Sequence, residues 1–226
     1  MMNDKAPVIA FDLDDTLYKE MDFVYSGYRA VAGTLAAATG VSADTLFDII
    51  AAGRPRGFED ALAYIDGMPG AATFTVDSMV EDYRAHRPHI CLHGDAEAAL
   101  TRLRDAGTHL VLVTDGSTRH QRSKIGALGL QRFFAPDDIL ISEETGGDKT
   151  TTVPWSIVES RYRGHRLTYV GDNMVKDFYL PNMRGWRTVM LRDPGCRNVF
   201  AQRPLDHAAL FRPQVTVDSL LALTSE

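Results

Sequence analysis

Four aspartates in two short segments have the residue type and spacing for metal or nucleophilic chemistry. Asp12 and Asp14 flank one leucine, while Asp172 and Asp177 flank four residues. In an extended chain, side chains two positions apart point the same way, so Asp12 and Asp14 can face one ligand. Two carboxylates about 4 Å apart repel by roughly 4 kcal/mol at an effective dielectric constant of about 20. Four carboxylates in one site would therefore need a cation, and their hard oxygen donors favour Mg²⁺.

Short apolar runs lead into these aspartates and into two further polar residues, Thr114 and Lys149. The runs cover residues 8–11, 110–113, 139–141, 167–170 and 188–191, with a weaker run at 215–217. Brief continuous apolar runs are typical of buried parallel strands. Because open parallel sheets bind ligands at the carboxyl ends of their strands, we expect these polar side chains to meet at one edge of a sheet.

The elements between the runs indicate the fold class and the domain organisation. Helical patterns separate most of the apolar runs, which favours an α/β fold with a Rossmann-like parallel-sheet core. Residues 18–88 break this alternation, because they contain helical patterns at 24–39, 43–52, 58–65 and 76–85 and no convincing strand. We therefore expect a core domain formed by residues 1–17 and 89–226, with an inserted helical domain at residues 18–88.

Taken together, the polar segments resemble the haloacid dehalogenase superfamily. Its four motifs appear in order as Asp-x-Asp-x-Thr at residues 12–16, Thr114, Lys149 and Gly-Asp-x4-Asp at residues 171–177. The resemblance extends from residue 8 to about residue 191. One departure is that many relatives have a proline close behind the lysine, whereas here Pro154 comes later.

This resemblance implies a Mg²⁺-dependent phosphatase that acts on a small phosphate monoester through an aspartyl-phosphate. Asp12 would be the nucleophile and a metal ligand, with the backbone carbonyl of Asp14 and the carboxylate of Asp172 as further ligands. Asp177 would bind the metal through water or hold Lys149. The Asp14 side chain would protonate the departing alcohol and then deprotonate the attacking water.

The same resemblance assigns substrate contacts and identifies the helical insert as a C1-type cap. Thr114 and Lys149 would stabilise the transferring phosphoryl group. Asp115 is a further candidate contact, although bonding within the turn is an alternative role for its side chain. Within the insert, Arg54 and Arg56 could face the leaving group, and a solvated loop is the alternative.

Other activities share part of this pattern. A dehalogenase of the superfamily uses an aspartate nucleophile but expels halide, which needs no proton from Asp14. A phosphomutase retains both aspartates and differs in how the cap holds its intermediate. A phospho-accepting receiver domain or another non-enzymatic binding protein also combines acidic residues with Thr and Lys, but a receiver domain is about half this length.

Composition and charge restrict the partners. The 226 residues are 45% hydrophobic and 24% charged, with a formal net charge of -6. This negative charge disfavours broad attachment to nucleic acid or to anionic membranes. The N-terminus fits neither a signal peptide nor a membrane span. We expect a cytoplasmic monomer or homodimer whose partner is a small phosphorylated metabolite.

Overall fold

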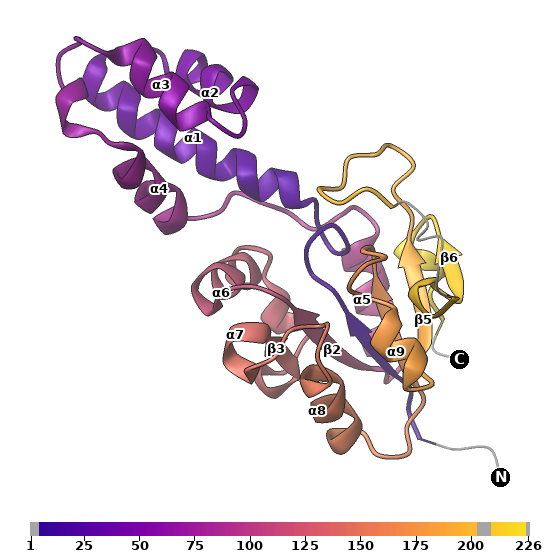
Figure 1. Ribbon diagram of the computed structural model, residues 1–226. Helices are drawn as coiled ribbons and strands as arrows, with labels where there is room; N and C mark the ends of the chain where they lie inside the picture. Colours follow the sequence, from indigo (N-terminus) through magenta and orange to yellow (C-terminus); the bar gives the residue numbers. More distant parts are fainter. Residues whose placement is uncertain (1–4, 203–208, 225–226) are drawn as a thin grey trace. The chain divides into compact units, whose positions relative to one another are not determined.

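The computed structural model describes residues 5–202 and 209–224, so the other residues of the predicted core domain lie outside the described chain. In this part of the chain, six parallel strands form one sheet in the order β3-β2-β1-β4-β5-β6 (Figure 1). The strands are β1 Val8–Phe11, β2 His109–Thr114, β3 Ile139–Ile141, β4 Leu167–Gly171, β5 Arg187–Leu191 and β6 Val215–Val217. The predicted α/β fold with a Rossmann-like parallel sheet is confirmed.

The pairing of β1 determines where a ligand site can form. Phe11, the last residue of β1, is in register with Leu112 of β2 on one side and with Val170 of β4 on the other. The strand order reverses at β1, because β2 and β3 extend the sheet one way and β4 to β6 extend it the other way. Such a switch point is where open α/β sheets bind ligands, at the carboxyl ends of the strands.

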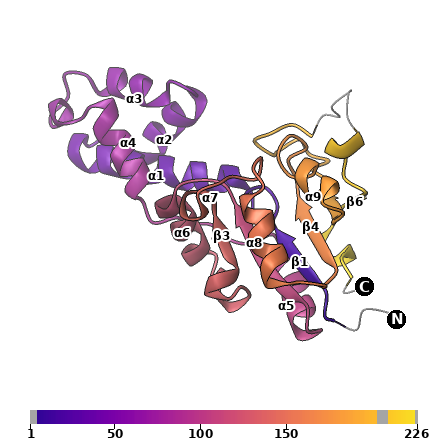
Figure 2. The same ribbon diagram turned by 60° about the horizontal axis from the view of Figure 1, so that its bottom comes forward.

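Helices cover both faces of the sheet. On one face, α8 (Val153–Arg161) and α9 (Tyr179–Met183) cover the sheet, as Figures 1 and 2 show. Their buried residues share a core with alternate residues of the strands, such as Val8 and Ala10 of β1. Trp155 of α8 is fully buried there, with its ring edge-to-face against Tyr169 of β4. On the other face, α5 (Ala96–Asp105) buries its apolar stripe against β2. Burial on both faces explains why the strands are apolar throughout.

The remaining helices of the sheet-containing unit lie at or near the strand ends. They are α6 Thr118–Ala127 and α7 Ser142–Thr145, with short 3₁₀ turns at Leu130–Arg132, Pro136–Asp138, Ala209–Phe211 and Leu220–Ala222. Helix α6 begins directly after the turn that follows β2, where the Ser117 hydroxyl accepts a hydrogen bond from the His120 N–H. This N-cap fixes the start of α6 next to the carboxyl end of β2.

The chain divides into two compact units, one formed by residues 1–20 and 91–226 and the other by residues 21–90. The second unit is helical, with α1 Glu20–Thr39, α2 Ala43–Ala52, α3 Gly57–Ile65, α4 Val76–Ala85 and a 3₁₀ turn at Ala71–Thr73. It has its own core, in which Val31, Leu35, Leu46 and Ile50 are fully buried.

Among the described residues, no helix combines the length and the apolar character needed to span a bilayer.

Candidate active site

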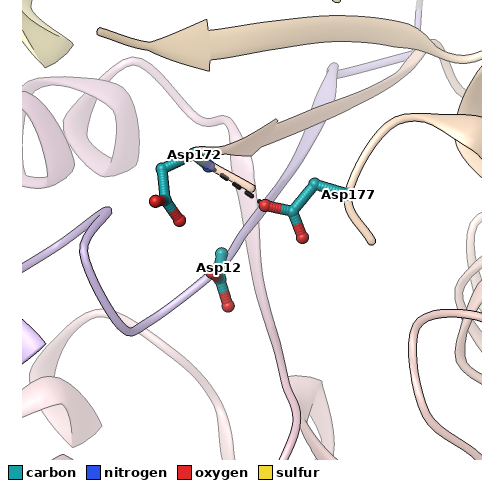
Figure 3. A group of neighbouring side chains, drawn as sticks. All are labelled: Asp12, Asp172 and Asp177. Carbon is teal, nitrogen blue, oxygen red and sulfur yellow. Dashed lines mark hydrogen bonds between the residues drawn. The ribbon is translucent and has the colours of Figure 1, made fainter. Parts of the chain in front are cut away.

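Three buried carboxylates meet at the carboxyl ends of β1 and β4. Asp12 directly follows β1, Asp172 directly follows β4, and Asp177 lies in the turn after Asp172. They are exposed by only 5%, 3% and 0%, respectively. One carboxylate oxygen of each lies within 4.8 Å of the others, and Figure 3 shows the three side chains grouped together. The structure therefore brings together three of the four aspartates predicted as metal ligands through their side chains or backbone.

Asp177 uses both of its carboxylate oxygens to hold protein donors. Its Oδ2 accepts hydrogen bonds from the backbone N–H groups of Asp172 (3.0 Å) and Asn173 (2.8 Å). Its Oδ1 accepts from Lys149 Nζ (2.7 Å) and from the Tyr169 hydroxyl (3.1 Å). Four donors occupy the approximately four lone-pair positions of a carboxylate. Of the two roles that the sequence left open for Asp177, binding the metal through water and holding Lys149, this geometry favours holding Lys149.

The glycine of the Gly-Asp-x4-Asp segment is required by this same contact. A Cβ atom on Gly171 would meet Asp177 Oδ2 at 2.4 Å, which is closer than real Cβ contacts allow. A side chain at position 171 would therefore push the Asp177 carboxylate away from the two backbone donors that it accepts from. The segment needs glycine for packing and aspartate for hydrogen bonding.

Lys149 lies between two of the carboxylates. Its Nζ is 2.8 Å from Asp12 Oδ1 and 2.7 Å from Asp177 Oδ1, and its side chain is only 5% exposed. The backbone of Lys149 is held at both polar groups, because its N–H donates to Asp115 Oδ1 (3.0 Å) and its carbonyl accepts from Trp155 Nε1 (3.1 Å). The loop that carries Lys149 is therefore held by hydrogen bonds from two other segments of the chain.

Two carboxyls of the cluster, those of Asp12 and Asp172, have raised pKa values, so added positive charge would stabilise their ionised forms. Burial raises the pKa of Asp12 to about 8, and repulsion from Asp177 and Asp14 adds to this effect against the attraction of Lys149. Burial, followed by repulsion from Asp177 and Asp12, raises the pKa of Asp172 to about 9. Without a metal, both carboxyls therefore bind protons more readily than an ordinary aspartate, and a protonated carboxyl is neither a good nucleophile nor a good metal ligand. A divalent cation between these oxygens would favour their ionised forms, so the donor set fits Mg²⁺.

Asp14 has the opposite environment. Its Oδ1 accepts from Lys124 Nζ (2.7 Å) and from the Tyr18 hydroxyl, and its Oδ2 accepts from Gln121 Nε2 (3.0 Å). Burial acts to raise the pKa of Asp14, but the charge of Lys124 and the hydrogen bonds from all three donors outweigh burial and lower it below the ordinary value. Asp14 is therefore held as a carboxylate, which is the form that accepts a proton.

Gln121 and Lys124 contact Asp14 from outside the four motifs, and neither was predicted from the sequence. Both are buried in α6, with exposed fractions of 1% and 6%. They share helical spacing with the buried apolar residues Ile125 and Leu128. Two polar residues on the apolar stripe of a helix that follows a candidate site strand are the signal that could have found them.

Thr114 and Asp115 end β2 and begin the turn that follows it. Thr114 is 2% exposed and its Oγ1 accepts from Gln121 Nε2 at 2.6 Å. Asp115 uses one carboxylate oxygen for the Lys149 N–H and the other for Lys176 Nζ at 3.4 Å. The role of Asp115 in substrate binding stays a prediction, and its carboxylate has a clear function in holding the Lys149 loop.

A segment outside the four motifs also reaches the site. It comprises residues 192–202, which follow β5. Asn198 Nδ2 donates to Asp172 Oδ2 (2.8 Å), and Gln202 Nε2 donates to the Asp172 carbonyl (3.1 Å). The backbone N–H of Val199 donates to Asp15 Oδ2 at 2.7 Å. The segment thus joins the ends of β1 and β4, and no local sequence pattern indicated it.

A pocket lies at the carboxyl ends of β1, β2 and β4. Among the described residues that line it, Phe200 is the only apolar side chain. The pocket is lined by Asp12, Asp14, Asp15, Glu20, Thr114, Asp115, Lys149, Asp172, Asn173, Lys176 and Phe200. Phe200 is 56% exposed. The pocket therefore offers charged groups for an anion and its metal, together with one aromatic surface for a carbon skeleton.

The two arginines predicted to bind the substrate belong to the helical unit formed by residues 21–90. They lie in the loop that leads from α2 into α3, where Arg56 precedes the first residue of α3. Arg54 Nη1 lies 3.0 Å from Met21 Sδ in the same unit. Their contact with the substrate stays a prediction.

The chain is similar to known hydrolases over most of its length. A family model for haloacid dehalogenase-like hydrolases matches residues 6–178. Ribulose-1,5-bisphosphate 5-phosphatase from Halopiger xanaduensis is 28% identical over 242 aligned residues, covering 97% of this chain and 98% of that protein. Glyceraldehyde 3-phosphate phosphatase from Methanocaldococcus jannaschii is 26% identical over 196 residues, covering 81% of this chain and 83% of that protein.

A likeness to solved structures extends over the whole fold. The HAD-hydrolase YfnB from Bacillus subtilis, whose crystal structure was determined bound to magnesium, has a TM-score of 0.63 and 18% sequence identity to this chain. The match covers 97% of this chain and 100% of YfnB. At this level of identity the likeness concerns the fold.

Proposed function

Because the chain belongs to the haloacid dehalogenase-like hydrolase family, we propose that it is a magnesium-dependent phosphatase acting through a phosphoaspartate on Asp12. The observation that carries this proposal is the position of Asp12, which lies near both the Lys149 ammonium and the Asp172 carboxylate. Asp14, on the same loop, forms an ion pair with Lys124. This placement supports the proposal, because Asp12 as nucleophile, Lys149 as the cation for phosphoryl oxygens and Asp14 as proton acceptor would then share one pocket.

The metal would be held by the carboxylates of Asp12 and Asp172 and by the backbone carbonyl of Asp14. Bound there, Mg²⁺ supplies positive charge that neutralises the buried carboxylates and the phosphate. Asp177 orients Lys149 and the backbone at Asp172 through its four hydrogen bonds.

In the first chemical step, an Asp12 oxygen forms a bond to phosphorus while the bond from phosphorus to the ester oxygen breaks. The leaving oxygen takes a proton from Asp14. In the second step, water attacks phosphorus and gives a proton to Asp14, and the Asp12–phosphorus bond breaks to release inorganic phosphate. Lys149 and the Thr114 hydroxyl bind equatorial phosphoryl oxygens in both steps.

The Lys124–Asp14 ion pair favours the second step and opposes the first, because it lowers the pKa of Asp14. It stabilises the Asp14 carboxylate, which is the form needed to take a proton from water. The first step needs the protonated form, so Asp14 takes up a proton from solvent water before the phosphoryl group is transferred. The structure described here therefore corresponds to the base form of the proposed acid–base pair.

We infer that the substrate is a small sugar phosphate, within a wider class of metabolite monoesters that includes nucleotide monophosphates. The two relatives that cover most of this chain act, by their names, on glyceraldehyde 3-phosphate and ribulose-1,5-bisphosphate. The aromatic face of Phe200 provides a surface for the C–H face of a sugar. We further propose that residues 18–88 form a C1-type cap in which Arg54 and Arg56 contact the leaving group.

Two alternatives from the same family are less well supported. A dehalogenase expels halide, which takes no proton, so three buried donors arranged around Asp14 would serve no purpose. A phosphomutase would use the same residues and would return the phosphoryl group to a sugar instead of to water. Release of inorganic phosphate in step with loss of ester distinguishes a phosphatase from a mutase.

The proposal is tested by measuring phosphate release from a panel of phosphorylated metabolites with Mg²⁺ and after chelation. We expect hydrolysis of small sugar phosphates that is lost on chelation and restored by Mg²⁺. Asp12→Asn should lower turnover by about 1,000-fold or more, because it removes the nucleophile. Its melting temperature should not fall, because the change also relieves repulsion among buried carboxylates. Near-normal hydrolysis by this variant would reject Asp12 as the nucleophile.

A further inference from the structure

The side-chain amide of Gln121 links two residues that line the pocket, Thr114 and Asp14. Its Nε2 lies 2.6 Å from Thr114 Oγ1, 3.0 Å from Asp14 Oδ2 and 2.9 Å from the Asp115 carbonyl oxygen. Gln121 is 1% exposed, so water does not compete for these contacts. One amide nitrogen thus contacts the proposed phosphate-binding hydroxyl, the proposed acid–base carboxylate and the backbone between β2 and α6.

The chemistry of these neighbours fixes the orientation of the amide. A backbone carbonyl and an ionised carboxylate only accept hydrogen bonds, so the NH₂ side of Gln121 must face Asp115 O and Asp14. An amide nitrogen has no lone pair with which to accept a hydrogen bond. The NH₂ group has two hydrogens for three oxygens, so one hydrogen is shared between two acceptors, and the Thr114 oxygen accepts in its contact with Gln121.

This contact determines where the hydrogen of the Thr114 hydroxyl points. Because the hydroxyl cannot donate to Gln121 Nε2, its own hydrogen must be directed elsewhere. Among the described residues, Thr114 Oγ1 donates no hydrogen bond, although the side chain is buried and lines the pocket together with Asp12 and Lys149. A buried hydroxyl that faces a fixed donor on one side is available as a donor on the pocket side.

We propose that Gln121 is a positioning residue that aims the Thr114 hydroxyl hydrogen at a phosphoryl oxygen and fixes Asp14 relative to that oxygen. The inference rests on the proposed phosphatase function. Without the amide, the Thr114 hydroxyl is free to rotate toward other acceptors, and Asp14 loses one of its three donors. A donor that must reorient during the reaction stabilises the transition state less than one already in place.

The principal test is Gln121→Met, which keeps the length and most of the volume of the side chain and removes the amide. We expect kcat to fall about tenfold to about 100-fold, less than the loss expected for removing a direct donor, with a smaller rise in KM. Gln121→Glu should be at least as impaired, because its carboxylate would accept the Thr114 hydrogen and repel Asp14. If Gln121→Met does not fold, Gln121→Glu tests the same point with an isosteric side chain.

A double-mutant cycle separates positioning from a structural role. Thr114→Val removes the hydroxyl and keeps the branched shape. If Gln121 acts through that hydroxyl, Gln121→Met should cost several-fold less kcat in the Thr114→Val background than in the wild type. Equal costs in both backgrounds, or wild-type kcat for Gln121→Met, would overturn the proposal.

Gln214→Met is the matched control for the loss of a side-chain amide, and phosphate binding gives a second measurement besides kcat. Gln214→Met removes an amide that bonds Asn182 Oδ1 and the Trp186 carbonyl, outside the residues that line the pocket, and should leave kcat unchanged. Calorimetric titration of the Mg²⁺-loaded protein with inorganic phosphate should show weaker binding by Gln121→Met than by wild type. If the wild type hydrolyses no ester, the proposed function fails, and the phosphate titration still decides the role of Gln121.

Discussion

Asp12 and Asp14 lie on one loop but in different electrostatic environments, which suits the two chemical roles proposed for them. Burial among other acids raises the pKa of Asp12 to about 8, whereas Lys124 and two hydrogen-bond donors outweigh burial at Asp14 and lower its pKa. A bound cation would therefore favour the ionised form of Asp12, whereas neighbouring protein groups already favour the ionised form of Asp14. Different environments of this kind are how enzymes separate nucleophilic and acid–base roles.

The dual role of Asp14 leads to a prediction about leaving groups. In Asp14→Asn, alkyl phosphates should fail at the first step, because an alkoxide leaves poorly without a proton. p-Nitrophenyl phosphate should still phosphorylate Asp12, because nitrophenolate needs no proton to depart. Rapid mixing should then show a burst of nitrophenolate approaching one equivalent per site, followed by slow turnover.

Asp12→Asn provides the matched control for this experiment, because it should give no burst with either substrate. Trapped phosphoenzyme in Asp14→Asn would identify the second step as the slow one. An equal loss of rate with alkyl and nitrophenyl esters, without a burst, would contradict the dual role of Asp14.

At the scale of elements, the segment 192–202 supports the site from outside the recognised motifs. Asn198 binds Asp172 Oδ2, and the Asn198 N–H is itself held by Asp193 Oδ2 at 2.6 Å. Lys19, in the loop after β1, bonds both Asn198 and Asp193. The segment thus orients the Asp172 carboxylate, a proposed metal ligand, through a hydrogen bond. Hydrogen bonds of this kind commonly fix the orientation of metal ligands in proteins.

Removing this support should weaken metal binding more than folding. We expect Asn198→Ala to lower the affinity for Mg²⁺ by about tenfold to about 100-fold, since outer partners of metal ligands contribute on this scale. The Mg²⁺ concentration that gives half-maximal activity measures the effect, and saturating Mg²⁺ should restore most of the turnover. Val199→Ala is the control, because its contact with Asp15 uses the backbone N–H and survives the substitution. Equal Mg²⁺ requirements in the two variants would exclude this role for Asn198.

At the scale of the whole molecule, the site concentrates negative charge in a protein whose formal net charge is already -6. Asp12, Asp172 and Glu20 all have raised pKa values, to about 8, about 9 and about 7, and burial is the largest cause at each. In the unfolded chain these carboxyls titrate near their ordinary values. From about pH 4 to about pH 9, these three carboxyls therefore hold more protons in the metal-free folded protein than in the unfolded chain, and their contribution makes its stability fall as pH rises.

The expected outcome is a melting temperature that declines from about pH 5.5 to about pH 8.5 in chelator and declines less in Mg²⁺. Mg²⁺ binds the ionised carboxylates, so its stabilising effect should be larger at the higher pH. Asp172→Asn should show a shallower decline and little response to Mg²⁺, because it removes one raised carboxyl and one ligand. A Mg²⁺ effect of equal size at both pH values would contradict this coupling between metal and protons.

The sequence by itself determined the sheet and the residues at its edge. Each strand is a short apolar run, and each run is followed at once by polar residues, so the positions of Asp12, Thr114 and Asp172 at strand ends could be read locally. Parallel strands place all their carboxyl ends at one edge, which makes the convergence of these residues a consequence of geometry. The helical content of residues 20–85 was likewise readable from local periodicity.

Only the tertiary structure decided which side chains serve the chemistry from outside the motifs. Lys124 and Gln121 reach Asp14 across 110 and 107 positions of sequence, and Asn198 reaches Asp172 across 26. Such contacts depend on how α6 packs beside β2 and on where the chain returns after β5, and no local pattern encodes either. The sequence shows which groups can react, whereas their protonation and orientation are decided by packing, because burial and distant partners control both.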